Sequence, residues 1–219
     1  MNRIRRAPAY ARSLAGLTAL ACFALLYSAG DVMAQRQTAA LAAAPVSLPD
    51  MVLGPAKAPV TIVEYASMTC SHCAAFEQNV FPMLKSKYID TGKVRFVFRE
   101  FPLDVLAAEA SMLARCSANN DSEKYFGVVE LLFTQQDQLI AQPKETLVRI
   151  GKQSGMSEQA VETCETDQPQ LDKIAADQKF AHETLKVDAT PTLFVNGEMI
   201  KGGPSFEDLD KKISLLLKK

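Results

Sequence analysis

Two cysteines, Cys70 and Cys73, lie where a strand-like segment of the chain gives way to a helical one. Residues 60–65 are mostly β-branched and aromatic, which predicts a strand. From residue 70 to residue 87, apolar residues recur at spacings of three and four, which predicts a helix that Pro82 bends near its end. Residues three apart share one face of a helix, so the two sulfur atoms can meet. The chain must therefore fold so that a strand delivers a cysteine pair to a helix N-terminus.

The position of this pair indicates redox chemistry. Free N–H groups and the helix dipole favour a thiolate at Cys70, and a protonated His72 beside it would favour the thiolate further. A low thiol pKa makes Cys70 a good leaving group, so a disulfide with Cys73 would be oxidising. A structural disulfide and half of a zinc site are the alternatives. A zinc site needs three or four ligands and the chain offers no second close pair, so we expect no metal and no bound cofactor.

The remaining segments predict an α/β fold. Residues 94–99 alternate apolar with basic side chains and predict a second strand, which completes a parallel β-α-β unit. Far downstream, residues 192–195 and 198–201 predict a hairpin around Asn196–Gly197, and residues 206–217 predict a closing helix. The long stretch between the two halves contains no convincing strand. Its helices are expected at residues 106–116, 124–134, 144–153, 158–164 and 171–185.

The first 34 residues have the three parts of a secretory signal. Four arginines and no acid open the chain, an apolar stretch runs from Leu14 to Ala29, and small residues precede the expected cleavage after Ala34. An uncleaved anchor and a lipoprotein site at Cys22 are alternatives. The apolar stretch is about 16 residues long, short of the roughly 20 that span a bilayer. We therefore expect a cleaved signal over residues 1–34 and export to the periplasm.

The charge and the cysteine count look different once this signal is removed. The whole chain has 24 basic and 25 acidic residues; the signal takes away four Arg and one Asp, which leaves 20 and 24, a net charge of −4. Such a body has no general attraction for nucleic acid. Four of the five cysteines stay, and an even number in an exported chain suggests disulfides, with three possible pairings.

The sequence resembles the DsbA-like thiol–disulfide oxidoreductases of the thioredoxin-fold superfamily, and in particular those of α-proteobacteria. The resemblance covers about residues 52–217. It rests on residues 60–65 leading into Met68-Thr69-Cys70-Ser71-His72-Cys73, and on the downstream segment Thr190-Pro191-Thr192-Leu193-Phe194-Val195-Asn196-Gly197. It implies a thioredoxin fold, β-α-β … β-β-α, with an inserted all-helical domain.

The resemblance also implies roles for individual residues. Cys70 is the exposed, reactive cysteine and Cys73 the buried, resolving one. Thr190 and a cis Pro191 would bind the substrate backbone as an added strand does, and Ser71 belongs to the same substrate-facing surface.

Glu64, six residues before Cys70, would accept protons from the buried cysteine; the alternative is a solvent-facing residue on a half-exposed strand. The resemblance suggests a structural disulfide between Cys116 and Cys164, with two separate buried thiols as the alternative. His182 has no motif around it and is expected to be a surface residue.

The implied function is that of a monomeric dithiol oxidase acting on reduced or misoxidised exported proteins and reoxidised by a quinone-linked membrane partner. An isomerase or reductase on the same fold is an alternative, because Ser71 and Thr190 depart from the best-known oxidases. A non-catalytic envelope binding protein is another. The expected divisions are a signal at 1–34, a flexible arm at 35–51, the first part of the thioredoxin domain at 52–103, the helical insertion at 104–187 and the second part of the thioredoxin domain at 188–219.

Overall fold

The computed structural model describes residues 46–218, so the expected signal and its cleavage site lie outside the described residues. The strands are β1 (Met51–Leu53), β2 (Val60–Ala66), β3 (Val94–Glu100), β4 (Thr192–Val195) and β5 (Glu198–Lys201). The helices around the sheet are α2 (Ser71–Asn79), α3 (Phe81–Leu84), the π-helical turn η1 (Lys85–Ile89), α9 (Gln168–Glu183) and α10 (Phe206–Leu216). The others are α4 (Val105–Ala118), α5 (Ser122–Thr134), α6 (Gln136–Ala141), α7 (Pro143–Gln153) and α8 (Glu158–Glu165).

The strands form one mixed sheet in the order β1-β3-β2-β4-β5. β2 and β3 are parallel, as the β-α-β pattern predicts, and the other neighbours are antiparallel. The helix between them returns the chain across one face of the sheet, which a parallel pair requires. β2 is therefore central, and the loop that follows it carries Cys70.

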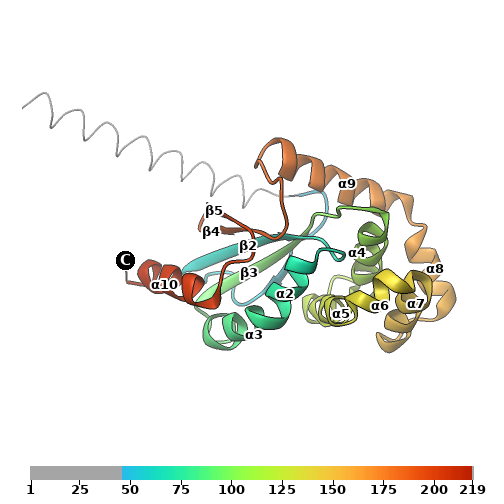
Figure 1. Cartoon of the computed structure of the whole chain (residues 1–219), viewed down its shortest axis with the longest axis horizontal. Helices are drawn as coiled ribbons and strands as arrows, with labels where there is room; N and C mark the ends of the chain where they lie inside the picture. The colour runs from blue at the N-terminus through green and yellow to red at the C-terminus, as the bar shows by residue number, and fades with distance from the viewer. Residues whose placement is uncertain (1–45, 219) are drawn as a thin grey trace, which may run out of the picture.

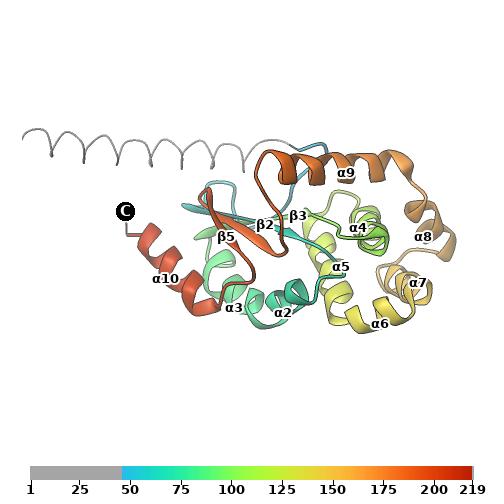
Figure 2. The ribbon, with the colours of Figure 1, turned by 45° about the horizontal axis from the view of Figure 1, so that its top comes forward.

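Helices cover both faces of the sheet, and a second group of helices lies beyond its end (Figures 1 and 2). α2, α3 and α10 lie on one face and α9 crosses the other. The helices α4 to α8 gather beside the sheet and form the helical block. Alternation along β2 follows this arrangement: Val63 and Tyr65 pack toward α9, whereas Ile62 packs into the core that includes Cys73 and Phe76. The α/β class with a helical insertion is therefore confirmed.

A buried ionic cluster fixes β3 to the helical block. Arg115 of α4 donates to both carboxylate oxygens of Glu100 at the end of β3, at 2.6 and 2.7 Å, and the Tyr125 hydroxyl donates to the same carboxylate at 2.6 Å. The remaining Arg115 nitrogen donates to the carbonyl of Pro49. A buried charge is tolerated only when it is paired and hydrogen-bonded, and here each charged group is.

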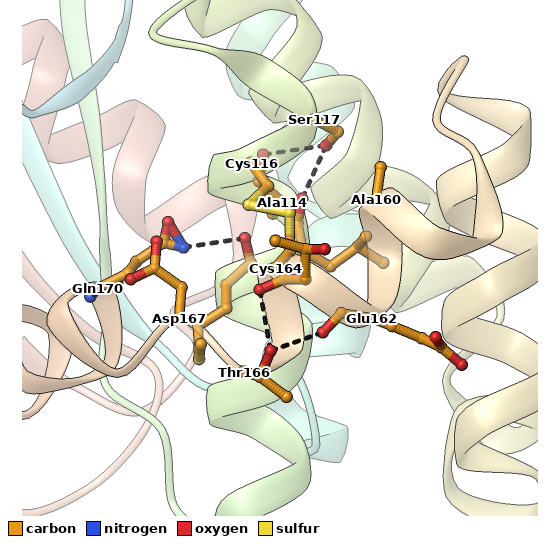
Figure 3. Close-up of a disulfide and its surroundings, with 12 residues drawn as sticks. Ala114, Cys116, Ser117, Ala160, Glu162, Cys164, Thr166, Asp167 and Gln170 are labelled. Atoms are coloured by element: carbon orange, nitrogen blue, oxygen red, sulfur yellow. Dashed lines mark hydrogen bonds between the residues drawn. A yellow bond between two sulfur atoms is a disulfide. The ribbon is translucent and has the colours of Figure 1, made fainter.

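A disulfide between Cys116 and Cys164 joins α4 to α8, with a sulfur–sulfur distance of 2.07 Å (Figure 3). The hydroxyl of Ser117 donates to the carbonyl oxygens of Leu113 and Ala114 in the preceding turn of α4. The bridge closes a loop with a sequence separation of 48 residues, so it connects two helices that are remote along the chain.

The end of the expected arm is held against the body. The N–H groups of Ser47 and Leu48 donate to the carboxylate of Asp177 on α9, and Asp50 pairs with Arg99 of β3 at 2.9 Å. Met51 already belongs to β1. Residues 47–50, which the sequence predicts to belong to a flexible arm, are thus held in place, because side chains from distant elements bind them.

Two local expectations differ from the structure. The helix expected over residues 70–87 is broken at Val80, and Pro82 lies in the first turn of α3 rather than in the last turn of one long helix. Proline is tolerated in a first turn, where its missing N–H has no partner to lose. The short elements β1 and α6 were also not predicted from the sequence.

None of the helices in residues 46–218 combines the length and apolar character needed to cross a membrane.

Candidate active site

Cys70 is the residue that precedes α2, in an extended conformation at the helix N-terminus. Its side chain is half-buried, and the next two residues, Ser71 and His72, are exposed. Cys73 lies in the first turn of α2, where 1% of its surface is exposed. Both thiols are free in this structure. One thiol is thus accessible to a partner molecule, while the other is covered by the protein.

The residue before Pro191 lies beside the Cys70 sulfur. Sγ of Cys70 donates to the carbonyl oxygen of Thr190 at 3.3 Å, and the Thr190–Pro191 peptide bond is cis. The sheet produces this contact, because β4 runs antiparallel to β2 with Thr192 opposite Tyr65. Residues just beyond the end of β2 and just before the start of β4 therefore meet at the same end of the sheet.

The surroundings of Cys70 lower the pKa of its thiol to about 5. The largest cause is hydrogen bonding from the Cys73 thiol, and the Thr190 side chain and the N–H groups of His72 and Cys73 add to it against the opposing effect of burial. A carbonyl cannot stabilise a thiolate, but the Thr190 hydroxyl can; within residues 46–218 this hydroxyl is buried without a hydrogen-bond partner. The stabilising group identified at His72 is its backbone N–H, whereas the sequence suggested its imidazole.

Glu64 lies in the core on the same face of the sheet as Cys73. It occupies β2 between Ile62 and Ala66, which pack into the cluster that contains Cys73. Only 1% of Glu64 is exposed, and its Oε2 has no partner among the described residues. Burial raises the pKa of this carboxyl well above its ordinary value, and it is also the largest cause that raises the pKa of Cys73, ahead of the hydrogen bond with Cys70 and the proximity of Glu64. The raised pKa values favour the protonated, neutral form of both Glu64 and Cys73.

Glu77, a second buried carboxyl that sequence reasoning missed, follows Cys73 by one helical turn. It is 8% exposed on α2, and its pKa is raised to about 8, mainly by burial and then by the charge of Glu130 on α5. Its charge also raises the pKa of Glu64. The only available sequence signal was its place on the apolar face of the helix, four residues after Cys73.

The helical block supplies two side chains to the loop before Cys70. Gln136 of α6 donates to backbone carbonyls there, and Asp104, which caps α4, accepts from the hydroxyl of Thr69.

His182 lies on α9, with Nδ1 3.0 Å from the carbonyl of Val187. No group of three or more His, Cys, Asp or Glu side chains suited to a metal ion occurs in the part of the chain that the structure describes.

This geometry suits thiol–disulfide exchange. The accessible thiol of Cys70 ionises easily, and the buried thiol of Cys73 is held protonated. The cis Thr190–Pro191 bond lies at the end of the sheet next to Cys70. In the oxidised pair, Cys70 would be the sulfur open to attack and the thiolate that the protein stabilises afterwards.

Comparison with known proteins places the chain in a family. A thioredoxin family model matches residues 47–214. A Rickettsia bellii protein named as a protein-disulfide oxidoreductase is 37% identical over 150 residues, which is 68% of this chain and 57% of the relative. The chain thus spans just over half the length of that curated relative. It belongs to the thioredoxin family.

Comparison with solved structures shows which members of the thioredoxin family the chain is similar to. Wolbachia pipientis alpha-DsbA1 is 35% identical, with a TM-score of 0.72 over 78% of this chain and 92% of that chain. Bacillus subtilis BdbD, 24% identical, has a TM-score of 0.69 over 78% of this chain and 94% of that chain and shares the fold. Within the thioredoxin family, the chain is therefore similar to the DsbA-type proteins of α-proteobacteria.

Proposed function

We propose that this chain is a dithiol oxidase that introduces disulfides into exported proteins through Cys70 and Cys73. The observation that carries the proposal is the lowered pKa of Cys70, about 5, beside a buried partner thiol. A protein that stabilises the Cys70 thiolate stabilises its reduced form, so its disulfide readily accepts electrons. The names of the relatives support disulfide chemistry of this kind.

The reaction proceeds by two exchanges. A substrate thiolate attacks Sγ of Cys70, the Cys70–Cys73 bond breaks, and Cys73 departs with the electron pair and takes up a proton from Glu64. A second substrate thiolate then attacks the substrate sulfur of the mixed disulfide, and Cys70 departs as a thiolate. The substrate loses two electrons and gains a disulfide, and the protein is left with two reduced cysteines.

The groups around the pair would hold the substrate during these steps. Thr190 and Pro191 form an edge along which an extended substrate backbone can align, and the exposed Ser71 and His72 face the incoming chain. We further propose that the protein works in the periplasm as a monomer. A quinone-linked membrane partner would reoxidise the cysteine pair and pass the two electrons on to the respiratory chain.

An isomerase or reductase is the second candidate, favoured by one observation. Thr190 stands before the cis-proline, and its buried hydroxyl can bond the Cys70 sulfur. A disulfide isomerase must be kept reduced in the cell, and stabilisation of the thiolate also serves that role. The two functions differ in whether the pair donates or removes disulfides.

Oxidative refolding of a reduced protein with several disulfides tests the proposal. The oxidised wild-type chain should accelerate disulfide formation, and Cys70→Ala should abolish the effect. Equal rates with and without the protein would rule out catalysis. Equilibration with glutathione then gives the redox potential: we expect a value near that of DsbA, about −120 mV, and one near that of thioredoxin, about −270 mV, would contradict the oxidase. Rescue of a scrambled substrate without net oxidation would favour the isomerase.

A further inference from the structure

Gln136 reaches from the helical block to the backbone on both sides of Thr69. Its Nε2 donates to the carbonyl oxygen of Met68 at 2.9 Å and to that of Cys70 at 3.1 Å. The side chain is 6% exposed, although it belongs to a run of polar residues at the start of the short helix α6. A buried amide with two donor contacts to one loop is well placed to fix that loop.

A second residue of the helical block holds the same loop from its side chain. The hydroxyl of Thr69 donates to Oδ2 of Asp104 at 2.7 Å, while Oδ1 of Asp104 caps α4 by accepting from Ala107. Within the loop, Ser67 contributes its hydroxyl, which accepts from the N–H of Leu103 at 3.2 Å. The segment from Ser67 to Cys70 is thus tied to the helical block at its backbone and at its side chains.

These contacts bear on the reactive sulfur through the Cys70 backbone. The carbonyl of Cys70 accepts from Gln136 and also from the N–H of Ala74 in the first turn of α2. The orientation of this peptide group determines where Sγ lies relative to the N–H groups of the helix and to Thr190. Free N–H groups at a helix N-terminus stabilise an anion only over a short range, so a small displacement would weaken them.

We propose that Gln136 is a positioning residue that holds Cys70 where its thiolate is stabilised, and that the helical insertion acts on the redox pair through this side chain. The proposal rests on the proposed function, since thiol–disulfide exchange at Cys70 is the reaction that it serves. The hydrogen bonds of Gln136 go to the backbone carbonyls of Met68 and Cys70, so it acts on the sulfur through the backbone.

The test replaces Gln136 by methionine, which keeps most of the side-chain length and removes the donors. Gln138→Ala is the matched control, because Gln138 lies on the same helix, is exposed, and accepts from Arg149. The first measurement is the pKa of Cys70, from the ultraviolet absorbance of its thiolate as the pH changes. The second is the equilibrium with glutathione, and the third is the thermal midpoint of unfolding.

Gln136→Met should raise the pKa of Cys70 and shift the glutathione equilibrium toward the protein disulfide by about fivefold, the effect of one typical hydrogen bond. The control should change neither. A lower thermal midpoint with an unchanged pKa and an unchanged equilibrium would reduce Gln136 to a structural role and overturn the proposal.

Thr69→Val provides an independent arm if the methionine variant does not fold. It removes the bond to Asp104 from a residue near the surface, and a shift of the Cys70 pKa in the same direction is expected. An unchanged pKa in this variant would overturn the proposal that the helical block positions Cys70 through this loop. The pKa measurement needs no substrate, and the redox equilibrium uses glutathione alone. Failure of the wild-type chain to oxidise proteins would therefore count against the proposed function and leave the positioning result to be judged separately.

Discussion

The sulfur of Cys70 lies 3.3 Å from the carbonyl oxygen of Thr190, a residue 120 positions further along the chain. The antiparallel pairing of β4 with β2 creates this contact, and the whole helical block is inserted between the two residues. Cys70 and the cis Thr190–Pro191 bond therefore come from opposite halves of the sequence. The chemistry at Cys70 depends on a correctly formed sheet.

Thr190→Val should raise the pKa of Cys70. The buried hydroxyl of Thr190 has no partner among the described residues, and its side chain lowers the pKa of Cys70, so it can donate to the thiolate; valine keeps the shape and removes the hydroxyl. A hydrogen bond to a charged group contributes about 1.5–3 kcal/mol, so the rise should be on the order of one unit. Thiolate absorbance as a function of pH measures it. Thr184→Val, at the exposed end of α9, is the control, and an unaltered pKa in Thr190→Val would show that the hydroxyl has no such role.

Stability should fall as the pH rises through the window set by Glu77. Its pKa is about 8 in the folded chain against an ordinary 4.5, so between these values the folded state holds a proton that the unfolded state has released. The contribution is complete below about pH 4.5 and is lost as the pH passes 8. Glu64, whose pKa is also raised, acts in the same direction.

Glu77→Gln should remove much of this pH dependence and stabilise the protein by a few kcal/mol at pH 8. Urea unfolding at a series of pH values measures the change. Glu130→Gln is a graded comparison: it removes only the neighbouring exposed charge and should lower the pKa of Glu77 without abolishing the slope. Parallel pH profiles for the wild type and Glu77→Gln would contradict the assignment.

Removal of the disulfide by Cys116→Ala and Cys164→Ala together should destabilise the chain without altering its redox pair. A loop with a separation of 48 residues corresponds to about 4 kcal/mol in the chain-entropy model. Denaturant unfolding of the double variant measures this loss, and the Cys70 pKa should stay at about 5. A displaced Cys70 pKa in a folded double variant would mean that the bridge also serves the active site.

Arg115→Met should cost about 3–5 kcal/mol of stability, because it leaves the Glu100 carboxylate buried without its cation. Lys144→Met breaks the exposed pair with Glu162 and should cost less than about 1 kcal/mol. Chemical unfolding of both variants gives the comparison. Similar small losses would contradict the conclusion that Arg115 stabilises a buried Glu100 carboxylate.

Several features could be predicted because their signals are local. The β-branched run before Cys70, the helical spacing after it, and the turn residues Asn196 and Gly197 each specify a strand, a helix or a hairpin within a few residues. β1 and α6 escaped prediction for the same reason, since three and six residues are too short for a period to be detected. Gln136 lies in a polar run that is typical of an exposed surface, and only packing buries it.

By itself, the sequence determined the place of the cysteine pair at a strand–helix junction and the order of elements around it. Only the tertiary structure decided which distant groups surround that pair: Thr190 at the sulfur, Glu77 beside Glu64 in the core, and Gln136 on the loop. The physical reason is that backbone propensity acts over a few neighbouring residues. The burial of a carboxyl or an amide depends instead on segments that meet only when the sheet and its helices pack.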